Sequence, residues 1–119
     1  MQISQCQEPL VSICIPMYNA EKTIGKTISS ILNQKYKNIE IIIVDNCSSD
    51  ASVKIIQSFN DPRLRLIQND IHLPKGEHNW NRCFAYAKGE FMAIFHADDV
   101  YLPDMIFRQN EMFEKNPTI

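Results

Sequence analysis

Ile39-Glu40-Ile41-Ile42-Ile43-Val44-Asp45 is the stretch of sequence that decides the fold of this chain. A nearly unbroken run of isoleucine and valine is typical of a strand that is buried on both faces, as in a parallel sheet between two layers of helices. We therefore expect this strand at the centre of a sheet or next to it. An acid, Asp45, stands where the run ends.

Strand-like and helix-like segments alternate on both sides of this stretch, which predicts an α/β fold. The sheet should be mainly parallel, with about four strands and helices on both faces. The other strands are expected at 11–15, which Pro16 should end because proline cannot donate to a ladder, at 64–67 on an edge, and at 91–95. Helices are expected at 21–33, around 53–59, at 74–88 with Gly89 as its stop, and at 103–115.

The composition predicts one globular domain over residues 1–119, because 45% of the residues are hydrophobic and only 22% are charged. The formal net charge is −2 and the basic residues are scattered, which argues against a nucleic-acid-binding surface. No apolar stretch approaches the roughly 20 residues of a membrane span. The four cysteines form no CxxC motif, so we expect reduced thiols and a cytoplasmic location.

Two adjacent acids end the last expected strand, in Phe91-Met92-Ala93-Ile94-Phe95-His96-Ala97-Asp98-Asp99. Neighbouring carboxylates repel one another, and a divalent cation is the natural partner that makes the arrangement favourable. A cap for the next helix is the alternative, but Pro103-Asp104 already offers a helix start. Ligands that are all oxygen favour Mg²⁺ or Mn²⁺ over zinc, and a strand-end His96 is more often structural.

The loop Pro16-Met17-Tyr18-Asn19-Ala20 follows the first expected strand, where ligands bind in open α/β sheets. Tyr18 could stack on a base, although a turn with a half-buried tyrosine is the simpler interpretation of this loop alone. Asp45 could accept a hydrogen bond from a base or a ribose. Its alternative role is a helix cap, for which Ser48, Ser49 and Asp50 are better placed.

Basic residues near the third expected helix, namely His72, His78, Lys75 and Arg82, could contact a phosphate or a base carbonyl. A solvated helix face explains them equally well. Lys75 is singled out because it precedes Gly76, where the chain can approach a ligand closely. No GxGxxG or GxxxxGK[ST] motif supports a dinucleotide or P-loop site.

Five linked segments closely resemble the family 2 glycosyltransferases of GT-A fold, and the resemblance covers about residues 10–105. They are Val11-Ser12-Ile13-Cys14-Ile15-Pro16-Met17-Tyr18-Asn19, Ser30-Ile31-Leu32-Asn33-Gln34, Glu40-Ile41-Ile42-Ile43-Val44-Asp45-Asn46-Cys47-Ser48-Ser49-Asp50, Ala87-Lys88-Gly89-Glu90-Phe91 and Ala97-Asp98-Asp99. The fold class implied is a Rossmann-like, nucleotide-binding half of a GT-A fold. The chain departs from the family pattern at Met17 (often threonine), at His96 (commonly an acid) and at Trp80 (commonly arginine).

The resemblance implies a site for a nucleoside-diphosphate sugar, usually a UDP-sugar. Its nucleotide-binding residues would be Pro16, Tyr18, Asn19, Asp45, Lys75 and Asp98. Tyr18 would stack on the base, Asp45 would bond the base N–H, and Lys75 would lie near the base or the phosphates. Asp98 and Asp99 would bind ribose and Mn²⁺ or Mg²⁺, which bridges the two phosphates and stabilises the departing diphosphate.

The intact enzyme implied by the resemblance is an inverting transferase that glycosylates an acceptor glycan or lipid-linked glycan in surface polysaccharide or glycoconjugate synthesis. We expect this chain to be its N-terminal donor-binding part, cut before the acceptor-binding part, with the general base beyond residue 119. Such an enzyme would act in the cytoplasm or at the inner face of the membrane. The alternative is a receiver-type signalling module, which also has βα units and clustered acids. That fold needs its acidic pair after the first strand, where Pro16-Met17-Tyr18-Asn19 stands.

Overall fold

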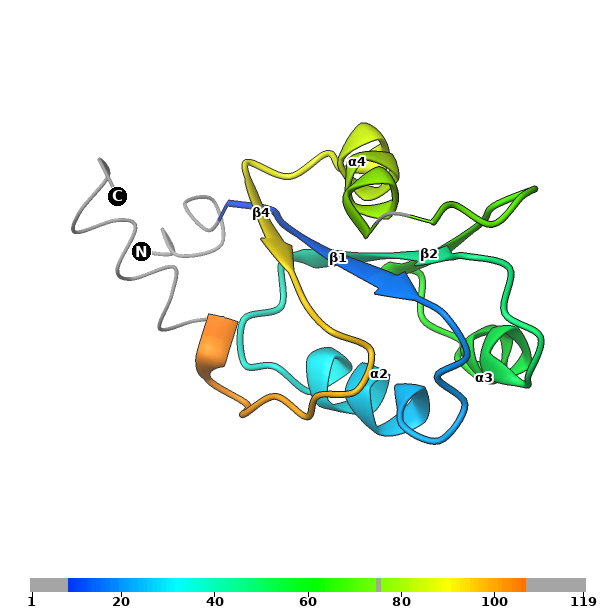
Figure 1. The fold of residues 1–119 in the computed structure, drawn as a ribbon. Helices are drawn as coiled ribbons and strands as arrows, with labels where there is room; N and C mark the ends of the chain where they lie inside the picture. Colours follow the sequence, from blue (N-terminus) through cyan, green and yellow to red (C-terminus); the bar gives the residue numbers. More distant parts are fainter. Residues whose placement is uncertain (1–8, 75, 107–119) are drawn as a thin grey trace, which may run out of the picture.

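The computed structural model describes residues 9–74 and 76–106, which contain one sheet of four parallel strands (Figure 1). The strands are β1 (Val11–Met17), β2 (Ile39–Asp45), β3 (Leu64–Gln68) and β4 (Phe91–Ile94). Their order across the sheet is β3-β2-β1-β4. The prediction of a parallel α/β sheet is therefore confirmed, with the isoleucine-rich β2 in the interior and β3 on an edge.

Helices cover both faces of the sheet, as predicted (Figure 1). The helix α4 (Gly76–Tyr86) packs on one face, against β1 and β2. The helices α2 (Ile24–Leu32) and α3 (Ser52–Ser58) lie on the other face, beside one another. α2 and α4 are shorter than the helices expected at 21–33 and 74–88, by one to three residues at each end, whereas α3 has the expected length and begins one residue earlier. Of the helix expected at 103–115, residues 103 and 104 form a turn, residues 105 and 106 are helical, and residues 107–115 lie outside the described residues.

Alternate residues of the inner strands divide between two apolar clusters, because successive side chains of a strand point to opposite faces. Ile13 of β1 and Ile41 of β2 pack with α2 in the larger cluster. The smaller cluster, on the α4 side, contains Cys14, Val44 and Cys83. The hydrogen bond to Cys14, together with burial, raises the pKa of the Cys83 thiol. The spacing in sequence gave no sign that these two cysteines meet.

Pro16 lies inside β1, so the prediction that it ends the strand was wrong. Carbonyl and amide groups of successive strand residues point to alternate sides. The Cys14 carbonyl accepts from the Phe95 amide on the β4 side, so Pro16 also faces that side. Because β4 pairs with β1 only as far as Cys14, the missing N–H of Pro16 costs no ladder bond.

Gly89 lies beside β1 and does not terminate α4, which already ends at Tyr86. A Cβ at this position would lie 2.6 Å from the Leu10 carbonyl oxygen and 2.6 Å from Ser12 Oγ. The glycine is needed for the close approach of two backbones rather than for a left-handed cap. Within the described ranges, no helix is both long enough and apolar enough to span a membrane.

Candidate functional site

The chain reverses direction across the sheet at β1, which defines where a ligand can bind. From β1 it runs through β2 to β3 on one side, and it then returns to place β4 on the other side of β1. Ligands of open α/β sheets bind at such a reversal, beyond the carboxyl ends of the strands. Three of these ends are level, because Met17 pairs with Asp45 and Asp45 pairs with Gln68.

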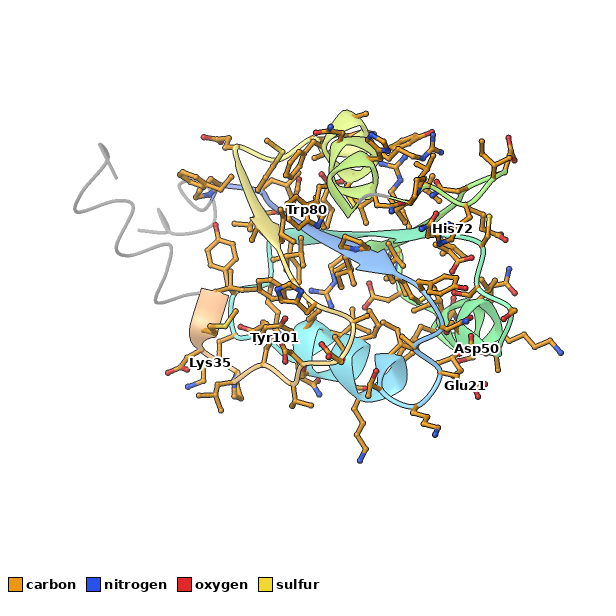
Figure 2. The ribbon with its side chains drawn as sticks, viewed as in Figure 1. Glu21, Lys35, Asp50, His72, Trp80 and Tyr101 are labelled. Atoms are coloured by element: carbon orange, nitrogen blue, oxygen red, sulfur yellow. The ribbon has the colours of Figure 1, made fainter. Side chains whose placement is uncertain are left out.

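The loops that follow β1 and β2 are linked to each other by reciprocal hydrogen bonds at this edge. The Asn19 amide donates to Ser48 Oγ at 2.8 Å, and the Ser49 amide donates back to Asn19 Oδ1 at 2.8 Å. Asn19 has a φ of 47°, a left-handed conformation that asparagine tolerates. Further along, Glu21 and Asp50 face each other, and the Glu21 amide donates to Asp50 Oδ2 at 3.2 Å (Figure 2). The Asn19 side chain thus connects the loop after β1 to the loop after β2.

Asp45 ends β2 and is 3% exposed. Its Oδ1 accepts from Ser48 Oγ at 2.5 Å and its Oδ2 accepts from the Ser48 amide at 3.3 Å. At the start of α3 it is Asp50 that accepts a backbone hydrogen bond, from the Ser52 amide to Oδ1 at 2.9 Å. Desolvation opposes ionisation of Asp50, but hydrogen bonds from Ser52 lower its pKa below the ordinary value. As the sequence suggested, Asp45 is not required as a helix cap.

Tyr18 and His72 form an aromatic pair at the same edge. Tyr18, the residue after β1, is 53% exposed. The ring of His72, from the loop after β3, meets it edge-on, with centroids 5.1 Å apart and an angle of 68° between the planes. The sequence left His72 as one of several basic residues near a helix. Its position in the loop after a strand was the signal that could have placed it at the site.

An amide network that the sequence did not reveal connects the loops after β2 and β3 with α4. Asn46 Nδ2 donates to the Leu73 carbonyl at 2.8 Å, and the Leu73 backbone amide donates to Asn46 Oδ1 at 2.7 Å. Asn69 Nδ2 donates to Asn46 Oδ1 at 3.0 Å and to Asn79 Oδ1 at 2.8 Å. The network fixes the loop that carries His72.

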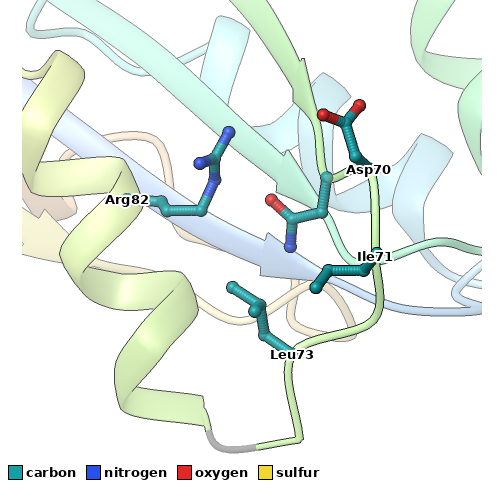
Figure 3. Close-up of a pocket in the computed structure, with 5 residues that line it drawn as sticks. Asp70, Ile71, Leu73 and Arg82 are labelled. Carbon is teal, nitrogen blue, oxygen red and sulfur yellow. The ribbon is translucent and has the colours of Figure 1, made fainter.

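A pocket of about 160 Å³ lies between this loop and α4, and Figure 3 shows Arg82 reaching from α4 towards it. It is lined by Asn69, Asp70, Ile71, Leu73 and Arg82. Asn69 Oδ1 and Arg82 Nε are buried there without a hydrogen-bond partner in the described part of the chain. One acceptor and one donor therefore face a small polar space. Lys75, predicted to contact the nucleotide, lies outside the described residues.

The acidic pair is exposed, in the turn that follows β4. The carbonyl of Ala97, the residue before Asp98, accepts hydrogen bonds from Thr23 and Thr27, each at 3.0 Å. These bonds bring the turn beside the start of α2, and therefore near the loop after β1. Burial raises the pKa of the nearby Tyr101 hydroxyl above its ordinary value, and the charge of Asp99 contributes to this.

The donor set at the acidic turn fits a magnesium-like cation that is shared with a phosphate ligand. Across residues 9–74 and 76–106, no group of three or more His, Cys, Asp or Glu side chains is placed to bind a metal. Two adjacent exposed carboxylates remain. Mg²⁺ is commonly bound by one or two carboxylates together with substrate phosphates, rather than by a complete protein cage.

Known proteins resemble this chain in sequence over nearly its whole length. UDP-Glc:alpha-D-GlcNAc-diphosphoundecaprenol beta-1,3-glucosyltransferase WfgD of Escherichia coli is 39% identical over 108 residues. The match covers 90% of this chain and 42% of WfgD, so the chain spans about two fifths of the length of this relative.

Solved structures share the fold. TarS of S. aureus in complex with UDP matches with a TM-score of 0.84 at 24% identity, over 90% of this chain and 32% of the TarS chain. The mannosyltransferase PcManGT of Pyrobaculum calidifontis in complex with GDP-Man and Mn²⁺ matches with a TM-score of 0.82 at 24% identity, over 94% of this chain and 34% of its own. The described fold is thus the GT-A fold of these enzymes. Because the sequence profile of glycosyl transferase family 2 matches residues 12–119, this chain belongs to that family.

Proposed function

We propose that this chain is the donor-binding part of an inverting glycosyltransferase that uses a nucleoside-diphosphate sugar, specifically a UDP-sugar. The observation that carries the proposal is the separation of two chemistries at one sheet edge. Tyr18 and the buried Asp45 lie on the β1–β2 side of the reversal, whereas the exposed acidic pair follows β4 on its other side. A nucleoside diphosphate has the same division, with a base at one end and charged phosphates at the other.

Each end of the donor has its own residues in this proposal. The exposed ring of Tyr18 stacks on the base, and Asp45, whose carboxylate keeps lone pairs beyond its two bonds to Ser48, accepts the base N–H. Pro16 and Asn19 shape the loop against which the base lies. Lys75 contacts the base or the phosphates.

Asp98 and Asp99 serve the other end of the donor, where Asp98 bonds the ribose and both acids ligate Mn²⁺ or Mg²⁺. The cation supplies charge neutralisation for the departing diphosphate. We assign no general base to this chain and place that group in the part of the relatives' length that the chain does not cover. A receiver-type module is not favoured, because the family profile and the position of the acids both argue against it.

The nucleotide and the acceptor are proposed from the relatives. WfgD is named for a UDP-glucose donor and an acceptor linked to diphosphoundecaprenol, and TarS was solved with UDP. PcManGT was solved with GDP-Man and Mn²⁺, so the base is the point to test. A glycan or lipid-linked glycan acceptor in polysaccharide synthesis would place the whole protein in the cytoplasm, at the inner face of the membrane.

Thermal unfolding with nucleotides tests this proposal. UDP with Mn²⁺ should raise the melting temperature, GDP should do so less, and a chelator should remove the metal-dependent part. At a ligand concentration a hundredfold above Kd, the gain in unfolding free energy is about 2.7 kcal/mol. Asp99→Asn should lose the Mn²⁺ effect, whereas Glu90→Gln, which removes an exposed acid at the other end of β4, should keep it. No shift at millimolar UDP and Mn²⁺ would contradict the proposal.

A further inference from the structure

The acidic turn is attached to α2 by a row of polar side chains. Thr23, Thr27, Ser30 and Gln34 recur every three or four residues and therefore lie along one side of that helix and its flanks. Beyond the bonds from the two threonines to Ala97, the Tyr101 amide donates to Ser30 Oγ at 3.0 Å. Gln34 Nε2 donates to the Leu102 carbonyl at 2.6 Å. The backbone on both sides of the acids is thus fixed to a helix.

Tyr101 is fixed at its ring as well as at its backbone. Its ring is stacked on that of Phe95, with centroids 4.1 Å apart and planes inclined by 23°. Phe95 is 4% exposed and belongs to the main apolar cluster. The ring therefore has little freedom, and the position of the hydroxyl at its end is defined by packing.

The hydroxyl of Tyr101 connects the two ends of the acidic turn. The His96 amide donates to Tyr101 Oη at 2.8 Å, and Tyr101 Oη in turn donates to Asp99 Oδ2 at 3.4 Å. The Asp99 amide closes the same turn on the His96 carbonyl at 3.4 Å. One phenolic group thus accepts from the backbone before the acids and donates to a carboxylate, and each bond of such a chain strengthens the next.

We infer that Tyr101 is a positioning residue for the cation site, which orients the Asp99 carboxylate through its hydroxyl. The inference rests on the proposed function, since it assigns to Tyr101 a role towards the ion that Asp98 and Asp99 would ligate. A hydrogen bond to one carboxylate oxygen restricts rotation of the group and directs the other oxygen outwards. Partners of this kind commonly change metal affinity by 10–100-fold when they are removed.

Tyr101→Phe separates this role from packing, because it keeps the ring on Phe95 and removes only the oxygen. Tyr36→Phe is the matched control, because it also removes one phenolic oxygen. The Tyr36 hydroxyl donates to the Pro9 carbonyl, beside the amino end of β1. The acidic turn lies at the other end of the strands, beyond their carboxyl ends. Both variants can lose stability, so the readout must be ligand binding by the folded chain.

Calorimetric titration of this chain with UDP, with and without Mn²⁺, gives that readout. Tyr101→Phe should bind UDP alone like the parent chain and should lose about tenfold in the affinity for Mn²⁺ measured at saturating UDP. Tyr36→Phe should match the parent in both titrations. A parent-like Mn²⁺ affinity in Tyr101→Phe would overturn the inference and leave the proposed function intact. If the parent chain itself binds UDP no better with Mn²⁺, the proposed function fails and this inference fails with it.

Discussion

Replacement of Gly89 by alanine should destabilise the chain, because two backbones approach each other too closely at this position to admit a side chain. The new Cβ would lie 2.6 Å from both the Leu10 carbonyl oxygen and Ser12 Oγ, and 2.8 Å from the Ser12 amide nitrogen. Two of these three atoms are backbone atoms, which cannot rotate away. The start of β4 must therefore move away from β1.

The size of the effect has two parts. Overpacking of a close contact costs about 1–3 kcal/mol. The same movement disrupts the hydrogen bond from the Gly89 amide to Ser12 Oγ, which is 2.8 Å long, and loss of one such bond costs about 1 kcal/mol. Ser12 is further tied to Glu40, whose Oε2 accepts from Ser12 Oγ and from the Lys88 amide at 2.5 Å each. We expect a total loss of about 2–4 kcal/mol, a large share of the roughly 5–15 kcal/mol typical of a domain.

Urea unfolding followed by circular dichroism measures this loss, and Gly25→Ala is the matched control. A Cβ on Gly25 would lie 3.7 Å from Ile55 Cγ2, an ordinary contact, inside α2. That variant should gain up to about 1 kcal/mol from helix propensity. The two identical substitutions should thus change the unfolding midpoint in opposite directions. A parent-like midpoint for Gly89→Ala, with the small gain present in Gly25→Ala, would refute the reasoning.

Three further predictions concern ligand binding, pH and activity. Asp45→Asn should weaken UDP binding by about 1.5–3 kcal/mol with or without Mn²⁺, whereas Asp99→Asn should abolish only the Mn²⁺-dependent part, and calorimetry that finds the two variants alike would remove this division of roles. Arg63 Nη2 donates a hydrogen bond to Asp61 Oδ2 at 3.0 Å, and this bond lowers the pKa of Asp61. The pair therefore stabilises the fold at any pH above the ordinary carboxyl pKa, and this stabilisation is lost as the pH falls through the lowered pKa of Asp61. Asp61→Asn should therefore cost at most about 1 kcal/mol near neutral pH, as expected of a partly exposed pair, and nothing at low pH; a cost independent of pH in urea unfolding would contradict this. This chain should transfer no sugar to an acceptor, although slow hydrolysis of the donor can persist, and a glycosidic product at a useful rate in a product assay would show that the general base lies within it.

The sheet could be predicted from the sequence because its signals are local. The run from Ile39 to Val44 is nearly all isoleucine and valine, and Asp45 is the next residue. Both features are visible in neighbouring positions of the sequence and do not depend on distant segments. The error at Pro16 has a different origin. Whether a strand tolerates proline depends on where its neighbour ends, and the neighbour, β4, lies far away in the sequence.

The site could be predicted only in part, for the same reason. Tyr18, Asp45 and the acidic pair lie at the ends of strands or shortly after them, and the level ends of β1 and β2 bring the first two to one edge. The contact of His72 with Tyr18 depends on the path of a loop. The network of Asn46, Asn69 and Asn79 requires three separate segments to meet, and no spacing in the sequence encodes that meeting.

The reciprocal bonds between the loops after β1 and β2 bear on the entropy of ligand capture. These loops exchange hydrogen bonds with each other, from the Asn19 amide to Ser48 and from the Ser49 amide to Asn19, without any ligand. Side chains and loops that are already ordered do not have to be immobilised when a partner arrives, and each side chain spared saves about 0.5–1.5 kcal/mol. The half of the edge that we propose to bind the base is therefore preorganised. Its amides should show the same hydrogen-exchange protection before and after UDP is added.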